Sequence, residues 1–183
     1  AELNELIQKR GMPPNMLLMM KPSGVMMTLL ALELQRLGIG QSGPDSVFFQ
    51  RAVADSKPVS GLESVDEHIR FVANMGEGNE ERFLRQTIID IEQTEVMMRD
   101  IVQKWKQGDS VGLERVVLDD MRAQYPRVYA SLIVERNQNW LPQIKAMLDD
   151  ADTEMVLVGA AHLIGNDGLI YALKKAGYAV EQM

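Results

Sequence analysis

His162 is the residue whose type and setting point most directly to chemistry. It follows an apolar run, residues 155–158, and three small residues, 159–161 (Gly-Ala-Ala), which let a ligand or another backbone approach closely. A histidine in such a place can serve as a metal ligand or as a general acid or base. A buried histidine bonded only to backbone fits the spacing equally well. We expect a strand and tight turn, residues 154–168, to deliver His162 to a site.

Glu63 is the second candidate. It ends a predicted short strand and directly precedes a capping box, residues 64–67 (Ser-Val-Asp-Glu), which marks the start of a helix. Its carboxylate could ligate a metal or act as a base, and an interaction with the positive end of that helix is the other interpretation. His68, the other histidine, lies in the first turn of the helix, where a partly exposed polar residue is expected.

Arg136 and Asn137 follow an apolar stretch inside a predicted helix. A guanidinium group matches a carboxylate bidentately, so Arg136 is a candidate to hold a substrate carboxylate or to orient Glu63. A solvated arginine on the surface of a helix explains the residue equally well.

Three short strands are expected to position these residues. The predicted strands are residues 59–63, 155–160 and 178–182. The second is a continuous apolar run, as in strands buried on both faces, and it forms a βαβ unit with the third through a helix over residues 169–176. We therefore predict an α/β fold with a parallel or mixed sheet and flanking helices. Glu63 and His162 both follow the carboxyl ends of strands, the edge where such sheets bind ligands.

Helices account for most of the remaining sequence. The predicted helices are Glu2–Lys9 and Glu80–Gln107, together with residues 22–37, 47–54, 110–123 and 128–148, and Pro22 is expected in the first turn of its helix. The long helix Glu80–Gln107 carries apolar residues at spacings of four and three, which is typical of a stripe packed in a core and also of a coiled coil. The last helix is expected to be interrupted or tightened near residues 137–142, which end in a proline.

The composition narrows the classes of function. The 183 residues carry a formal net charge of −7, so the basic surface that attracts nucleic acid is missing and no nucleic-acid partner is expected. The longest apolar run, residues 25–32, is far shorter than the roughly 20 residues of a membrane-spanning helix, so we expect no membrane span in this chain. The lack of cysteine excludes disulfides and thiolate metal sites.

Three segments together resemble the TraB/GumN family. Residues 61–68 (Gly-Leu-Glu-Ser-Val-Asp-Glu-His) resemble its Gly-Leu-Glu-Thr-x-Glu-Glu-Gln stretch, and residues 135–140 resemble its Arg-Asn helix. Residues 158–169, with 177–178, resemble its C-terminal Gly-x-x-His segment, which is the most specific of the three. The order and spacing agree with the family over nearly the whole chain.

The resemblance implies a single α/β domain over residues 1–183, related to Tiki-type proteases and erythromycin-esterase-like proteins. In that family two Gly-x-x-His segments, with a glutamate between them, are thought to form a metal-dependent hydrolytic site. Carried over, His162 matches the second histidine and Glu63 the glutamate, each as a metal ligand or catalytic group. Arg136 and Asn137 match an Arg-Asn pair, which we assign as a structural or orienting contact of the bound substrate or cofactor.

The chain also departs from the family pattern. It contains no first Gly-x-x-His, so it looks truncated at the N-terminus, and His68 replaces the usual glutamine. His162 and Glu63 alone are fewer than the three protein ligands of a typical catalytic metal. We therefore expect this fragment to be inactive and to form a homodimer or exchange strands through the apolar surface left uncovered.

The function implied for the intact protein is that of a metal-dependent, peptidase-like hydrolase. A divalent metal ion of unknown identity would act there on a peptide or small-molecule substrate. Two alternatives stay open: a non-catalytic protein that binds a small ligand or haem in the same cleft, as the related ChaN-like proteins suggest, and an assembly protein built on the helix Glu80–Gln107. Most bacterial members are exported or membrane-attached, which implies an extracytoplasmic location, although the residues themselves leave localisation open.

Overall fold

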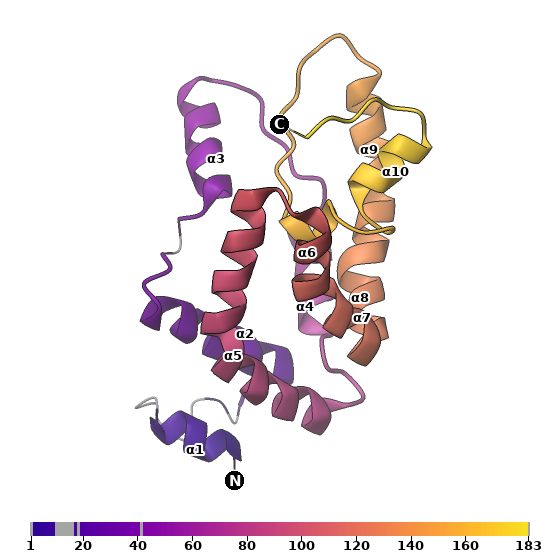
Figure 1. The fold of residues 1–183 in the computed structure, drawn as a ribbon. Helices are drawn as coiled ribbons and strands as arrows, with labels where there is room; N and C mark the ends of the chain where they lie inside the picture. Colours follow the sequence, from indigo (N-terminus) through magenta and orange to yellow (C-terminus); the bar gives the residue numbers. More distant parts are fainter. Residues whose placement is uncertain (1, 10–16, 18, 41, 183) are drawn as a thin grey trace. The chain divides into compact units, whose positions relative to one another are not determined.

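Every regular element of the structure is a helix. The computed structural model describes residues 2–9, 17, 19–40 and 42–182, and within them it contains no strand, so the predicted α/β fold is wrong (Figure 1). None of the helices in these ranges is long and apolar enough to cross a membrane. The chain divides into two compact units, one of Ala1–Arg51 with Val65–Met98 and the other of Ala52–Ser64 with Arg99–Met183.

The first unit contains α1 (Glu2–Lys9), α2 (Pro22–Arg36), α4 (Val65–Ala73), most of α3 (Pro44–Ala54) and the first part of α5 (Glu80–Gln107). Its core is apolar and consists of Leu6, Ile7, Leu17, Val25, Leu29 and Ile91. The hydroxyl of Ser23 donates to the backbone oxygen of Ala73, 3.3 Å away, and so ties α2 to α4.

The helices predicted for this unit are confirmed, with shifts at some ends. α1 and α5 have the predicted bounds, and α2 begins at Pro22, which confirms the expected place of this proline in the first turn. α3 begins at Pro44, three residues before the predicted start at residue 47. Proline suits a first turn because its missing amide would have no partner there.

The apolar stripe of α5 is part core and part surface. Ile91 is buried, and Leu84 and Ile88 pack against the same core, whereas Val102 and Trp105 are 44% and 63% exposed. Packing within the first unit therefore explains the first half of the stripe. The homodimer expected from the sequence stays a prediction.

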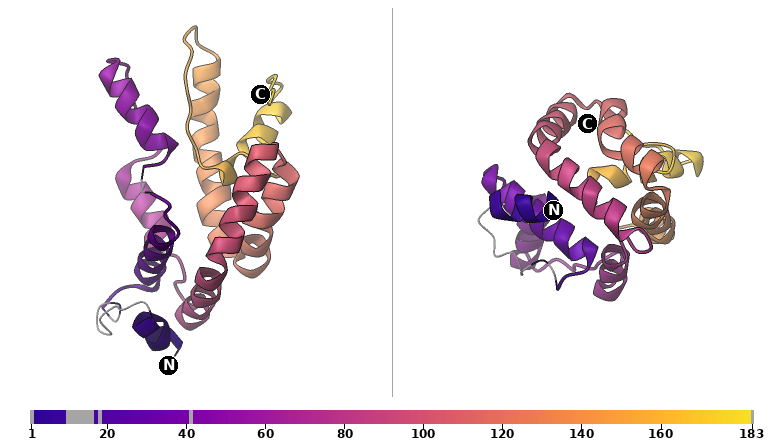
Figure 2. Two further views of the ribbon diagram at one scale, coloured as in Figure 1. Left: turned by 60° about the vertical axis from the view of Figure 1, so that its left-hand side comes forward. Right: turned by 90° about the horizontal axis from the view of Figure 1, so that it is seen from below.

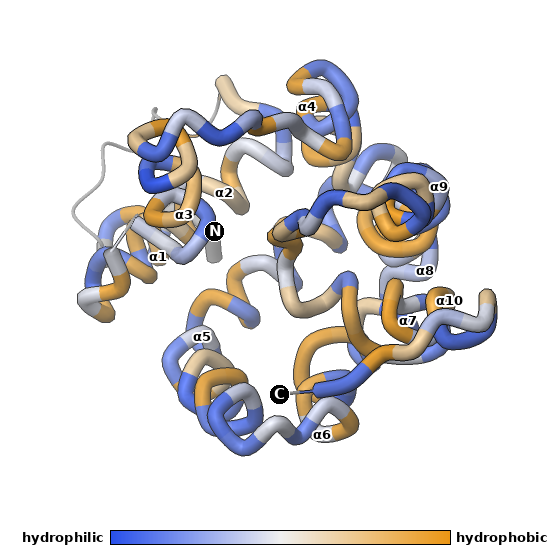
Figure 3. The backbone as a smooth tube through the Cα atoms, turned by 90° about the horizontal axis from the view of Figure 1, so that it is seen from above, coloured by the Kyte–Doolittle hydropathy of each residue, from blue (hydrophilic) through white to orange (hydrophobic). Residues whose placement is uncertain are grey.

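The second unit is built on two irregular helical stretches. The first runs through α6 (Ser110–Glu114), a π-helical segment (Arg115–Asp119) and α7 (Asp120–Gln124), and the second through α8 (Pro126–Tyr129), another π-helical segment (Ala130–Glu135) and α9 (Arg136–Leu148). α10 (Leu169–Lys175) contacts α9 (Figure 2). In Figure 3 these helices carry both apolar residues (orange) and polar residues (blue), as amphipathic helices do.

Two apolar clusters hold this unit together. One consists of Leu113, Leu118, Tyr129, Ile133 and Ile164. The other consists of Trp140, Ile144 and Leu169. Both clusters join the second helical stretch to the segment that carries His162, and so they fix the position of that segment.

The irregularity of the second stretch lies earlier than predicted. α9 continues through Pro142, which costs the helix one backbone hydrogen bond without ending it. The π-helical segment Ala130–Glu135 comes before it, and Arg136 and Asn137 are the first residues that follow. π-helical turns occur frequently at functional sites, and here one directly precedes the Arg-Asn pair.

The three segments predicted as strands are not strands. Residues 59–63 lead into α4, residues 155–159 lead into a short 3-10 helix (Ala160–His162), and residues 178–182 follow α10 without forming a regular element. An apolar run becomes a strand only when neighbouring extended backbone takes up its amides and carbonyls. Among the described residues no such neighbour exists, so the predicted βαβ unit and its sheet edge are wrong as well.

Candidate functional site

The residues singled out from the sequence come together in the second unit. Glu63 lies in the segment before α4, Arg136 and Asn137 begin α9, and His162 ends the 3-10 helix before α10. Arg136 contacts Glu63 across 73 positions of sequence and His162 across 26. Helices and loops, and not the edge of a predicted sheet, therefore bring Glu63 and His162 together. His68, by contrast, is exposed in α4 and belongs to the first unit.

Arg136 binds Glu63 through two parallel hydrogen bonds. Nη2 donates to Oε1 at 2.8 Å, and Nε donates to Oε2 at 3.0 Å. The two side chains are 15% and 14% exposed, so both charges are largely removed from water. Of the two interpretations of Arg136, the structure has the contact that orients Glu63 and not a solvated surface arginine.

Asn137 fixes the proton of His162. Its Nδ2 donates to the backbone oxygens of Asp167 at 2.8 Å and of His162 at 3.3 Å, so the amide oxygen faces the imidazole. Nδ1 of His162 lies 2.8 Å from that oxygen, and because an amide oxygen only accepts, Nδ1 carries the proton. Nε2 is then unprotonated and accepts from Nη1 of Arg136 at 3.3 Å.

His162 is neutral at neutral pH. The side chain is 6% exposed, and burial, followed by the positive charge of Arg136, lowers its pKa from 6.5 to about 4, with the Glu63 carboxylate opposing the shift. The neutral ring has one defined tautomer with a lone pair on Nε2. Such a group can accept a proton or donate its lone pair to an electrophile.

Trp140 completes the site, although it was assigned no role from the sequence. It lies one turn after Arg136, whose guanidinium carbon is 4.6 Å from the centre of the indole ring, and the indole and imidazole rings are 4.5 Å apart. Trp140 is 4% exposed, and its Nε1 has no hydrogen-bond partner in the part of the chain that the structure describes. Trp140 follows Arg136 by four positions, and this spacing in the sequence predicts that the two residues share one face of the helix.

The turn after His162 depends on two glycines. Gly165 has a φ of +76°, and a Cβ on Gly168 would collide with the backbone oxygens of Ile164 and Leu163. Other residues disfavour such a conformation and such close approach. The turn directs the backbone oxygen of Asp167 toward Asn137.

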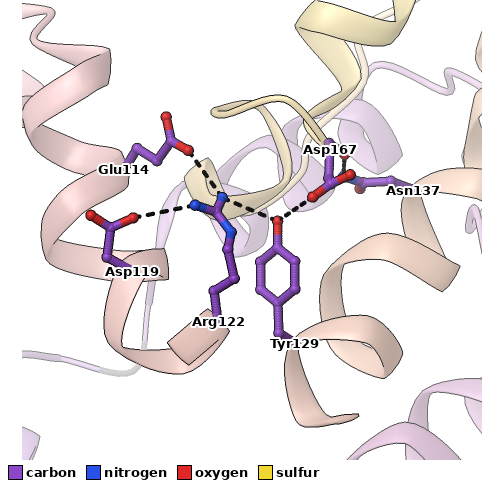
Figure 4. A network of polar contacts seen from close by, with 6 residues as sticks. All are labelled: Glu114, Asp119, Arg122, Tyr129, Asn137 and Asp167. Carbon is purple, nitrogen blue, oxygen red and sulfur yellow. Dashed lines mark hydrogen bonds and ion pairs between the residues drawn. The ribbon is translucent and has the colours of Figure 1, made fainter. Parts of the chain in front are cut away.

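A second polar cluster, also missed in the sequence analysis, holds the side chain of Asp167. The Tyr129 hydroxyl donates to Oδ2 of Asp167 at 2.7 Å and accepts from Nη2 of Arg122 at 3.3 Å. Arg122 also donates to Glu114 at 3.0 Å and to Asp119 at 3.3 Å. Figure 4 shows this cluster with Asn137 beside Asp167, at the point where the two clusters meet.

The arrangement does not fit the metal ion that the resemblance implies. Both oxygens of Glu63 accept from Arg136, and so does Nε2 of His162, so an ion bound to either residue would face the charge of the guanidinium. In the described ranges no group of three His, Asp or Glu residues is placed to hold a metal ion, whereas a catalytic metal usually has three protein ligands. The same contact at Nε2 disfavours His162 as an axial haem ligand.

Comparison with known proteins identifies the family. A family model, described as the TraB/PrgY/gumN family, matches residues 1–182, a range that includes every residue of the site. Searches of curated proteins and of solved structures returned no match. The family match confirms the resemblance drawn from the three sequence segments, and this chain belongs to the TraB/PrgY/gumN family.

Proposed function

We propose that this chain carries the polar centre of a peptidase-like hydrolytic site, which cleaves an amide or ester bond of a peptide or a small molecule. The observation that carries the proposal is the convergence of Glu63, Arg136 and Asn137 on His162, since the motif residues from three distant segments meet around one neutral imidazole. Hydrolysis is also the class of reaction that the resemblance of the three sequence segments implies, and the chain belongs to the family that they resemble.

In this proposal His162 acts as the general base. Its Nε2 lone pair takes a proton from a water molecule that attacks the carbonyl carbon, and the imidazolium then gives that proton to the leaving amine or alkoxide as the bond between the carbonyl carbon and the leaving group breaks. Asn137 holds the Nδ1 proton and so keeps the lone pair at Nε2. The contact from Arg136 to Nε2 is 3.3 Å long, whereas the contacts to Glu63 are 2.8 Å and 3.0 Å, so Nε2 is the position from which water can displace the guanidinium most easily.

Arg136 stabilises the negative charge that develops on the carbonyl oxygen. A guanidinium held at a fixed angle by Glu63 is a preorganised donor for an oxyanion. The buried Nε1 of Trp140 is a second donor for a substrate oxygen, because no described group of the chain accepts from it. No step of this chemistry runs through a metal ion.

Hydrolysis assays on matched histidine variants test the proposal. A mixture of unstructured peptides and a chromogenic ester are incubated with the wild type, His162→Ala and His68→Ala, and the products are followed by mass spectrometry and absorbance. Loss of a general base lowers turnover by roughly 100-fold or more, so we expect that loss in His162→Ala and none in His68→Ala. Equal turnover in all three proteins would contradict the proposal. So would a lack of turnover by the wild type, which would instead agree with the inactivity expected from the missing first Gly-x-x-His.

A further inference from the structure

Asp167 is bound at two points by the same helical stretch. Its carboxylate accepts from the Tyr129 hydroxyl at 2.7 Å, and its backbone oxygen accepts from Nδ2 of Asn137 at 2.8 Å (Figure 4). We propose that Tyr129 and Asp167 are positioning residues, which act through Asn137 to hold His162 in a single tautomer. The role in catalysis rests on the proposed function, whereas the effect on the tautomer is independent of it.

The tautomer of His162 depends on which end of the Asn137 amide faces the ring. In the structure the NH₂ group faces two backbone oxygens, those of Asp167 and His162. A flipped amide would place its oxygen against both of these acceptors and its NH₂ group against Nδ1, which would move the imidazole proton to Nε2. That proton would then point at Arg136, which offers only donors. The carbonyl of Asp167 therefore selects the tautomer.

The position of that carbonyl depends in turn on Tyr129. Arg122 can only donate, so the oxygen of Tyr129 accepts from Arg122 and its own proton goes to Asp167. Tyr129 is 6% exposed, and burial raises the pKa of its hydroxyl, which keeps the proton available for Asp167. The direction of every hydrogen bond from Arg122 to His162 is thereby fixed.

Arg122 and Glu114 support Tyr129 from the more exposed side. Their side chains are 39% and 26% exposed, with 3.0 Å between Nη2 of Arg122 and Oε1 of Glu114. Arg122 also lies over the Tyr129 ring, 5.0 Å from its centre. Arg122 and Glu114 limit the movement of the Tyr129 hydroxyl. They therefore stabilise the turn that contains Asp167 and are not part of the site itself.

Nitrogen NMR of the imidazole rings tests the proposal at a single neutral pH. The chain has only two histidines, so selectively labelled protein gives two ring systems, and the exposed His68 is the internal reference. We expect the wild type to show His162 as a neutral ring with the proton on Nδ1. We expect Tyr129→Phe and Asp167→Ala to lose this single state and to shift both ring nitrogens toward the average of the two tautomers.

Two conservative variants separate positioning from a general loss of structure. Tyr178→Phe removes another tyrosine–aspartate hydrogen bond, from Tyr178 to Asp149 at 3.0 Å, which is not connected to Asn137, and it should leave His162 unchanged. Asp167→Asn keeps an acceptor for Tyr129 and should retain the wild-type tautomer where Asp167→Ala loses it. If Tyr129→Phe does not fold, the comparison of Asp167→Ala with Asp167→Asn tests the proposal.

A wild-type tautomer in folded Tyr129→Phe or in Asp167→Ala would overturn the proposal, as would its loss in Tyr178→Phe. The outcome is distinct from that of the hydrolysis assay. An intact tautomer without hydrolysis rejects the proposed function alone, and hydrolysis with an unchanged tautomer in Tyr129→Phe rejects the positioning role alone.

Discussion

The two arginine clusters of the second unit have similar chemistry and different surroundings. Arg136 and its partner Glu63 are 15% and 14% exposed, and 73 positions of sequence separate them. Arg122 is 39% exposed, and its partners Glu114 and Asp119 lie eight and three positions before it. The ion pair of Arg136 joins distant segments away from water, whereas the ion pairs of Arg122 are local and more exposed to solvent.

This difference decides what each cluster contributes. Charges in water interact weakly because the solvent screens them, and exposed pairs add little stability. Charges removed from water cost a desolvation penalty, so each needs its partner, and removing one partner is expensive. The Arg136 cluster therefore fixes protons and charges, while Arg122 and its carboxylate partners support a turn.

The largest expected effect comes from removing Arg136. Arg136→Met leaves the Glu63 carboxylate buried without its bidentate partner, and we expect it to lower the free energy of unfolding by about 3–5 kcal/mol. Urea denaturation of the variant and the wild type measures this loss. A loss below about 1 kcal/mol would place Arg136 with the exposed arginines and remove the difference between the clusters.

A smaller effect is expected from acid, and it belongs to the Arg136 cluster, which contains the buried histidine. The pKa of His162 is about 4 in the folded chain against 6.5 as its ordinary value, so the unfolded chain binds a proton first as the pH falls. The contribution of His162 to stability is complete above pH 6.5 and is lost between pH 6.5 and about 4. The expected loss is about 2–3 kcal/mol.

Urea denaturation at pH 7 and near pH 4.5 checks the acid effect. Carboxylates titrate in the same range, so the loss in His162→Gln is subtracted from that in the wild type. An equal pH dependence in both proteins would show that His162 is not held neutral by its surroundings.

The smallest effect is expected at Arg122. Arg122→Met removes partly exposed contacts to Glu114 and Asp119, and we expect a loss of about 1 kcal/mol or less. Raising the salt concentration should reduce that loss further, since exposed charges are screened, and should change the Arg136→Met loss much less. The same salt dependence for both variants would contradict the assigned difference in exposure.

Local signals explain which parts of the fold were predictable. α1 and α5 were predicted with their bounds because helix periodicity and end signals lie within the helix itself. The apolar residues 155–158 were wrongly assigned to a strand, because a strand depends on partners elsewhere in the chain, which a single segment does not reveal. Met155, Val156 and Leu157 are in fact 63%, 37% and 39% exposed.

Only those contacts of the site that follow from the chemistry of the residue types could be predicted from the sequence. The match between guanidinium and carboxylate suggested that Arg136 orients Glu63, and this contact is present. Tyr129 and Asp167 were missed, because a tyrosine in an apolar helix and an aspartate between two turn glycines have ordinary structural explanations. Only the three-dimensional structure shows that they meet beside Asn137.

A double-mutant cycle on Glu63 and Arg136 tests the central claim, that distant motif residues form one coupled site. Glu63→Gln, Arg136→Met and the double variant are unfolded in urea, with the Glu114–Arg122 pair as the matched exposed control. We predict a coupling of about 2–3 kcal/mol for the buried pair, because the double variant leaves no unpaired charge, and a clearly smaller value for the control. A coupling for Glu63 and Arg136 below about 0.5 kcal/mol would show that these two residues do not form one coupled site.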